Sequence, residues 1–128
     1  MQALVEMIDF RYHSLAVLLA LRVEARTRAG KSILPTRLIG RGDRDLPSRE
    51  GEMAVLASRR AVARLCRLNT CLTRSIVLFQ LLERRYRVKL EMGFRSGSEG
   101  PDGHAWVTVD GVPLGEHEEN LETFTTVG

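Results

Sequence analysis

The spacing of apolar residues predicts a long helix at the start of the chain. Residues 3–28 place apolar side chains at helical intervals, and Gly30 ends the pattern. Such a broad stripe can face either a core or a partner protein; its members are Leu4, Met7, Ile8, Leu15, Leu18, Leu19 and Val23. The following segment, 31–51, contains proline, glycine and alternating charges, and it is predicted to be a surface loop.

Two further helices are predicted before residue 86. Ser48 is a suitable N-cap for a helix that runs to about residue 65. Its expected buried side is Met53, Leu56, Ala57, Val62 and Leu65. Asn69 is the predicted N-cap of the next helix, at about 70–85. Apolar residues surround this last helix almost completely, which predicts a position in the centre of the domain.

The period of the pattern changes at residue 86. Apolar and polar residues alternate over 86–94, as in a half-buried strand. A flexible segment is expected at 96–103, a second strand at 104–109, a hairpin turn at Asp110-Gly111 and a returning strand at 112–116. The predicted fold class is α+β, with N-terminal helices, a central buried helix and a small antiparallel sheet.

The length of 128 residues suits one domain, 1–128. We expect 1–50 to form a helical N-terminal extension with its loop, and 51–128 to form the core. The longest apolar run, 15–21, is shorter than the roughly 20 residues of a membrane span. The N-terminus also lacks the features of a secretion signal. A cytoplasmic location and two free thiols are therefore expected.

Charge is distributed unevenly along the chain. Residues 1–95 hold all 19 Lys and Arg against nine acids, whereas 96–128 hold seven acids and no Lys or Arg. A basic surface can bind a polyanion or an acidic peptide. A solvated arginine-rich surface is the simpler interpretation, so no nucleic acid is expected and nucleic-acid or peptide binding is kept as an alternative.

Cys71 is a candidate nucleophile because it falls in the first turn of the predicted central helix. The unpaired N–H groups and the positive end of the helix dipole favour a thiolate at such a position. The Cys71 backbone N–H is also a candidate oxyanion donor when a thiolate attacks a carbonyl. The alternative interpretation is a small apolar residue at a helix start.

His104 is the candidate base for this thiol. It opens a predicted strand directly after a glycine-rich segment, where a side chain can face a cleft. A third group is needed to orient the imidazole, and both Asp110 and Glu116 are candidates. Asp110 also has a purely conformational explanation as a turn residue.

The hairpin register decides whether Glu116 can reach the imidazole. A two-residue turn places His104 opposite His117. A three-residue loop pairs Thr108 with Val112 and places His104 opposite Glu116. Both loops are common in proteins. We favour the three-residue loop because it completes a triad of Cys, His and acid.

A zinc site is the main competing interpretation of these residues. Cys66, Cys71, His104 and His117 form a Cys₂His₂ set, but the Cys-x₄-Cys spacing spans a helix junction instead of a tight knuckle. No metal and no cofactor are therefore expected. Cys66 otherwise fits buried packing, and Trp106 fits either the wall of a substrate groove or the core.

Two motifs resemble a known family. Asn-Thr-Cys-Leu-Thr-Arg-Ser at 69–75 and Gly-His-Ala-Trp-Val at 103–107, followed by Val-Asp-Gly-Val-Pro-Leu at 109–114, resemble the lasso-peptide leader peptidases. These are small bacterial cysteine proteases related to transglutaminases and papain. The resemblance covers about residues 55–120. It implies a papain/transglutaminase-like fold, Cys71 as nucleophile and His104 as base, with Glu116 where the family usually has aspartate.

The resemblance also implies a reaction and partners. Such proteins remove the leader from a ribosomally made precursor peptide through an acyl-enzyme, and an ATP-dependent lasso cyclase then uses the freed amine. We expect a separate leader-binding (recognition element) protein, which docks on the apolar face of 4–23 or on the Arg-rich loop after it. The alternatives are acyl transfer of the transglutaminase or amidase type by the same pair, and a zinc-binding or peptide-binding module without enzymatic activity.

Overall fold

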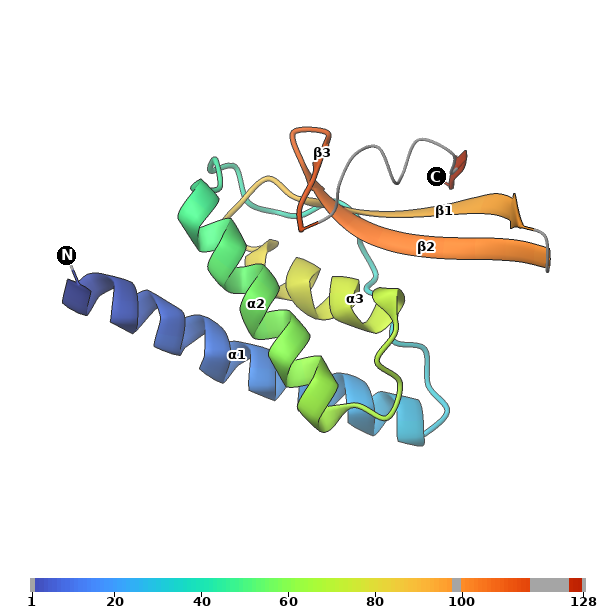
Figure 1. The fold of residues 1–128 in the computed structure, drawn as a ribbon, viewed down its shortest axis with the longest axis horizontal. Helices are drawn as coiled ribbons and strands as arrows, with labels where there is room; N and C mark the ends of the chain where they lie inside the picture. The colour runs from blue at the N-terminus through green and yellow to red at the C-terminus, as the bar shows by residue number, and fades with distance from the viewer. Residues whose placement is uncertain (1, 98–99, 116–124, 128) are drawn as a thin grey trace.

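The computed structural model describes residues 2–97, 100–115 and 125–127 and has the predicted α+β architecture (Figure 1). Helices come first and a small antiparallel sheet follows. The elements are α1 (Gln2–Arg28), α2 (Ser48–Leu65), α3 (Cys71–Leu82), β1 (Lys89–Gly97), β2 (Gly100–Val109), β3 (Val112–Pro113) and β4 (Thr125–Val127). Across these described residues, the helices contain no stretch with the length and apolarity that crossing a membrane requires.

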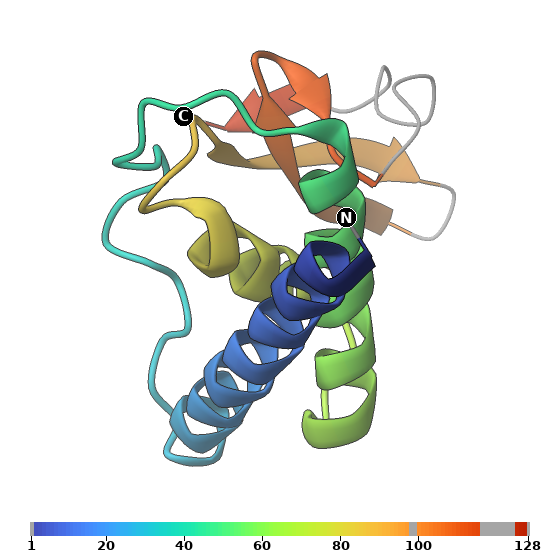
Figure 2. The ribbon, with the colours of Figure 1, turned by 90° about the vertical axis from the view of Figure 1, so that its left-hand side faces the viewer.

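Helix α3 lies between the other two helices and the sheet, as its sequence predicted (Figures 1 and 2). It packs against α1 and α2 on one side and against β2 and β1 on the other. Its largest fully buried side chains are Ile76, Val77, Phe79 and Leu82. Burial from both sides fixes this helix, because a close-packed interior resists a shift of any one element.

The buried sides of α1 and α2 are made largely of small residues. They include Ala16, Ala20 and Val23 of α1, and Ala54, Ala57 and Ala61 of α2. The expectation that Leu56 would be buried is wrong, because its side chain is 44% exposed. Leu18, in the apolar stripe of α1 that could face either a core or a partner, is 64% exposed. Small side chains let helix axes approach closely, so the alanine faces pack inward and leave these leucines outside.

Both predicted N-caps are displaced by one residue. Helix α2 starts at Ser48 itself and Pro47 occupies the cap position. Helix α3 is capped by Thr70 instead of Asn69, because the Thr70 hydroxyl accepts a hydrogen bond from the Thr73 N–H at 3.1 Å. Cys71 is consequently the first residue of α3, which keeps it in the first turn.

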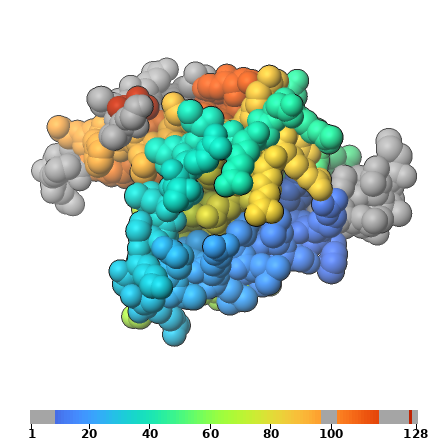
Figure 3. All heavy atoms as spheres, turned by 180° about the vertical axis from the view of Figure 1, so that it is seen from behind, coloured from blue at the N-terminus to red at the C-terminus, as the bar shows by residue number. Residues whose placement is uncertain are grey.

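The loop between α1 and α2 is held against the sheet and the end of α3. Leu90 donates its N–H to the Leu38 carbonyl at 2.7 Å, and Gly42 donates to the Glu83 carbonyl at 2.9 Å. A Cβ atom at Gly42 would lie 2.0 Å from the Arg85 carbonyl carbon, so only glycine fits there. Figure 3 shows this loop in cyan, crossing from α1 to the sheet.

The strand bounds differ from the predicted ones: β2 begins four residues earlier, β1 is shifted by three residues toward the C-terminus, and β3 ends at Pro113. The sheet order is β3-β2-β1-β4, and β1 pairs with β2 from Lys89 opposite Thr108 to Gly97 opposite Gly100. The described part of 96–103 therefore belongs to this ladder, and the expectation of a flexible segment there is wrong. Cross-strand hydrogen bonds outweigh the turn-forming preference of its Gly, Ser and Pro residues. Strand β4, which pairs with β1, was not predicted.

The hairpin between β2 and β3 has a two-residue turn. Asp110 and Gly111 have φ values of 51° and 81°, and Val109 pairs with Val112. The favoured register, in which Thr108 pairs with Val112, is therefore wrong. Two successive residues with positive φ are typical of a type I′ turn, whose twist matches that of the flanking strands.

One buried hydrogen bond connects α3 to the sheet. The Ser75 hydroxyl donates to the Ala105 carbonyl of β2 at 2.9 Å. Ser75 lies one helical turn after Cys71, and Ala105 directly follows His104. This bond therefore fixes the two elements that carry the candidate catalytic residues relative to each other.

Replacing Ser75 by alanine should lower the free energy of unfolding by about 1–3 kcal/mol, because the buried Ala105 carbonyl loses a donor from another element. Ser58→Ala is the matched control. Ser58 is also buried, but its hydroxyl bonds the Val55 carbonyl within the same helix, where the ladder supplies a second donor. Urea unfolding should show a change of less than about 0.5 kcal/mol for the control. Equal losses in both variants would contradict the linking role of Ser75.

Candidate active site around Cys71

Cys71 lines an open pocket of about 360 Å³ between α2, α3 and β2. The Cys71 side chain is half-buried, so its sulfur is partly screened from solvent yet reachable from the pocket. The wall contains apolar groups and two guanidinium groups; it is formed by Val55, Ser58, Arg59, Ala63, Asn69, Cys71, Arg74, Ser75, Leu78, Trp106, Val107 and Leu114. A peptide side chain can occupy such a volume beside the thiol.

The first turn of α3 leaves backbone donors beside the sulfur. The Thr73 N–H is bonded by the Thr70 hydroxyl and the Arg74 N–H by the Thr70 carbonyl. Within the described ranges, the Cys71 N–H donates no hydrogen bond. This N–H is therefore free to stabilise an oxyanion formed next to Sγ.

The contribution of α2 to this site was missing from the sequence-based prediction. Arg59 lies one turn after Val55 and one before Ala63, so one face of α2 forms a side of the pocket. Arg74 was part of the motif but had no assigned role. Its guanidinium donates to both the carbonyl and the side-chain oxygen of Asn69, at 2.9 and 2.8 Å. The motif spacing Cys-x-x-Arg was the available signal.

His104 lies beside the pocket and not in its wall. Its ring stacks on that of Trp106, with 5.7 Å between ring centroids and 22° between ring planes. Alternation along β2 places His104 and Trp106 on one face, while Val107 on the other face joins the core against α3. Trp106 is buried and contributes to the pocket wall. The structure thus brings Trp106 and Cys71 to one pocket, and His104 is stacked on Trp106 next to that pocket.

The two candidate acids have different positions. Asp110 lies exposed in the hairpin turn, about 20 Å along the strand from His104 at the usual rise per residue. A carboxylate cannot bond an imidazole over that distance, so this geometry argues against Asp110 as the third catalytic residue. Glu116 lies outside the described residues, as does His117 of the alternative zinc set. Among the residues that are described, no three His, Cys, Asp or Glu side chains form a metal-binding group.

Cys66 has a different environment from Cys71. Its thiol donates to the Ala20 carbonyl of α1 at 3.5 Å. Burial, together with the nearby Glu24 carboxylate, raises the pKa of the Cys66 thiol. Because the thiolate is the reactive form, a raised pKa makes Cys66 a poor nucleophile at neutral pH.

A Cys71→Ala variant, which leaves only Cys66, should therefore react with iodoacetamide more slowly at pH 7.5 than a cysteine in an unstructured peptide. Its rate should continue to rise with pH beyond about 8.5, the ordinary cysteine pKa. Cys66→Ala is the matched variant that reports on Cys71 alone. If the Cys66 thiol reacted as fast as the cysteine of the unstructured peptide, the conclusion that Cys66 is a poor nucleophile would be wrong.

Comparison with known proteins agrees with this arrangement. The family model described as the transglutaminase-like superfamily matches residues 15–128. Neither the curated proteins nor the solved structures contain a significant match to the chain. The matched region includes the second half of α1, all of α2 and α3, and the sheet. Because the match spans far more than half of its length, the chain belongs to the transglutaminase-like superfamily, which includes cysteine proteases and acyl transferases.

Proposed function

We propose that this protein is a cytoplasmic bacterial cysteine protease that removes the leader from a lasso-peptide precursor. The observation that carries the proposal is the position of Cys71, at the first residue of a buried helix and in the wall of an open pocket. Membership of the transglutaminase-like superfamily supports the cysteine chemistry. The motifs around Cys71 and His104 support the narrower assignment to leader removal.

The first half of the proposed reaction transfers the leader to Cys71. His104 accepts the thiol proton, and Sγ attacks the carbonyl carbon of the scissile amide. The negative charge on the carbonyl oxygen is stabilised by the Cys71 N–H at the start of α3. When the C–N bond breaks, His104 returns the proton to the leaving amine, and the leader remains attached as a thioester.

The second half releases the leader. Water loses a proton to His104 and attacks the thioester carbonyl, the C–S bond breaks, and Cys71 regains the proton as the leader leaves with a free carboxylate. Acyl transfer uses the same thioester but an amine in place of water. The identity of the second product therefore distinguishes a protease from a transferase.

Replacing Cys71 by alanine should abolish leader cleavage while leaving the fold intact, because the side chain is only half-buried. His104→Gln should lower the rate by about 100-fold or more, since the thiol loses its base. The assay combines the protein with a candidate precursor peptide and a candidate leader-binding protein, and identifies the products by mass spectrometry. A free core peptide and a leader carboxylate are expected.

Cys66→Ala is the control, because it removes the other thiol without touching the pocket. It should cleave at a rate close to that of the wild type. Cleavage by the Cys71→Ala variant would overturn the proposal, as would a leader joined to an added amine in place of a carboxylate.

The leader-binding partner is proposed to dock on the outer side of α1. This helix buries its alanine side and exposes large apolar side chains on the other: Phe10, Leu15, Val17, Leu18 and Leu21. They follow helical spacing, so one side of α1 presents a continuous apolar stripe. A helix in a hydrophobic groove is a common mode of such recognition.

Leu21→Glu should weaken binding of the leader-binding protein by about tenfold or more, because it places a charge within the apolar stripe. Leu56→Glu on α2 is the matched control, since Leu21 and Leu56 are 48% and 44% exposed. Titration calorimetry with the purified partner measures both. If the two variants bound the partner with equal affinity, this side of α1 would be excluded as the docking surface. The protease proposal is tested separately, by the cleavage assay.

A further inference from the structure

Glu24 is unusual among the charged residues of this protein. Within the described part of the chain it is the one charged side chain that is buried, with 7% of its surface exposed. A buried carboxylate is costly unless its oxygens are bonded. The hydrogen-bond partners of the Glu24 carboxylate therefore indicate its role in the structure.

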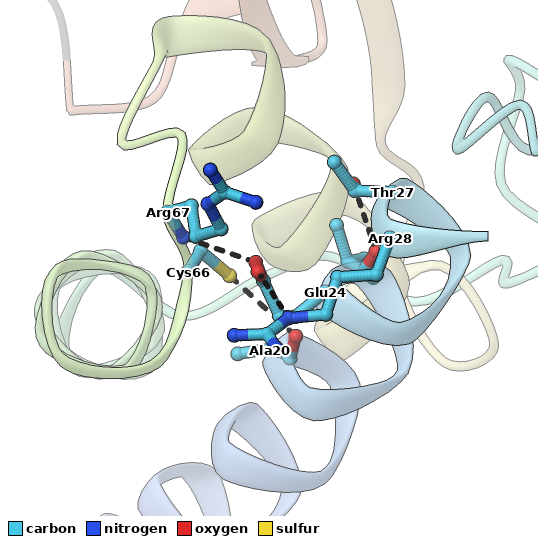
Figure 4. A network of polar contacts seen from close by, with 7 residues as sticks. Ala20, Glu24, Thr27, Arg28, Cys66 and Arg67 are labelled. Carbon is cyan, nitrogen blue, oxygen red and sulfur yellow. Dashed lines mark hydrogen bonds and ion pairs between the residues drawn. The ribbon is translucent and has the colours of Figure 1, made fainter. Parts of the chain in front are cut away.

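The Glu24 carboxylate connects α1 to the segment between α2 and α3 (Figure 4). Oε2 accepts a hydrogen bond from the Arg67 backbone N–H at 3.0 Å, and Oε1 accepts one from Arg28 at 3.1 Å. One turn earlier in α1, the Ala20 carbonyl accepts a weaker hydrogen bond from the Cys66 thiol, at 3.5 Å, because a thiol is a poor donor. Two successive residues after α2 are thus bonded to successive turns of α1.

This segment leads directly to the candidate nucleophile. It runs from Cys66 to Thr70, and Cys71 follows as the first residue of α3. Its other end is also held, because Arg74 bonds Asn69 and the Thr70 hydroxyl caps the helix. With both ends bonded, the backbone has little freedom where it enters α3.

The Glu24 carboxylate is well suited to remain ionised in this place. The Arg67 N–H, and after it the Arg28 side chain, lower the pKa of Glu24 against the opposing effect of burial. Because the folded-state pKa is lowered, the contribution of this contact to stability is present at neutral pH and is lost as the pH falls through that pKa. An ionised acceptor also makes a stronger bond to a backbone N–H than a neutral one.

We infer that Glu24 is a positioning residue for Cys71, acting through the Arg67 backbone to fix where α3 begins. The inference rests on the proposed role of Cys71 as nucleophile. Misplacement of a reacting group by about 1 Å can lower a rate by about 100-fold, so a fixed helix start matters for attack on a carbonyl. Helix α1 is then a functional part of the active site, although none of its described side chains lines the pocket.

The contact depends on reach, which allows a sharp test. Glu24→Asp keeps the charge but shortens the side chain by one methylene, so the carboxylate no longer reaches the Arg67 N–H. Glu24→Gln keeps the length and one oxygen acceptor. Glu50→Asp is the matched control, because Glu50 also joins α1 to the rest of the fold, accepting hydrogen bonds from Tyr12 and Tyr86 at 3.1 and 2.9 Å.

The test makes two measurements on the wild-type protein and on each variant. The first is the rate of Cys71 alkylation by iodoacetamide, followed separately from Cys66 by peptide mass spectrometry. The second is kcat and KM for precursor cleavage. Glu24→Asp should slow alkylation of Cys71 and lower kcat, each by about tenfold, with KM within about twofold of the wild type. Glu24→Gln and Glu50→Asp should stay within about threefold of wild type in both measurements.

The inference would be overturned by wild-type Cys71 reactivity and kcat in Glu24→Asp. It would also be overturned if Glu50→Asp lowered the alkylation rate of Cys71 and kcat as much as Glu24→Asp does. The effect would then come from a general loss of packing around α1. Alkylation needs no peptide substrate, so the role of Glu24 is decided even if the wild-type protein does not cleave the precursor. Failure of wild-type cleavage would count against the proposed function alone.

Discussion

The hydrogen bond from Ser75 to the Ala105 carbonyl is the interaction on which the site depends most. It joins the helix that starts with Cys71 to the strand that carries His104, deep inside the molecule. A buried carbonyl without a donor is unfavourable, and a misplaced α3 would leave this one unpaired. The bond therefore selects one position of the helix against the sheet from the several that apolar packing alone would allow.

The outer helices secure this arrangement from the other side. Their alanine faces let α1 and α2 close around α3, and residues on both sides of position 50 contribute to a single core. The family match begins at residue 15 and so includes the half of α1 that carries Ala16, Ala20 and Glu24. This half of α1 accordingly lies within the matched region and contributes to the same core as α2 and α3.

The sequence predicted the elements that have a strong local signature. Helix α3 is apolar on all sides and begins with a cap, so its central position and the place of Cys71 in its first turn were both expected. Alternation identified the first part of β1, and the strand predicted at 104–109 is the second part of β2. The motifs around Cys71 and His104 indicated the transglutaminase-like fold class, which the family match confirms.

The remaining features depend on contacts between distant residues, and periodicity carries little information about those. Large apolar residues are poor guides to the buried side of α1, because the close approach of two helices favours alanine. The hairpin register was decided by the ability of Asp110 to adopt positive φ, which the composition of the turn left open. The bond from Glu24 to the Arg67 backbone joins residues 43 apart, and a backbone donor leaves no signature in the sequence.

These long-range contacts also determine when the site can exist during synthesis of the chain. Helix α3 is made before β2, and the residues joined by the Ser75 bond are 30 positions apart. Until β2 has been made, the Ser75 hydroxyl has no strand to bond and Trp106 is not there to complete the pocket wall. Contacts between segments far apart in the sequence form more slowly than the local contacts of a helix. A nascent chain thus carries the thiol of Cys71 without a working site around it until β2 has been made.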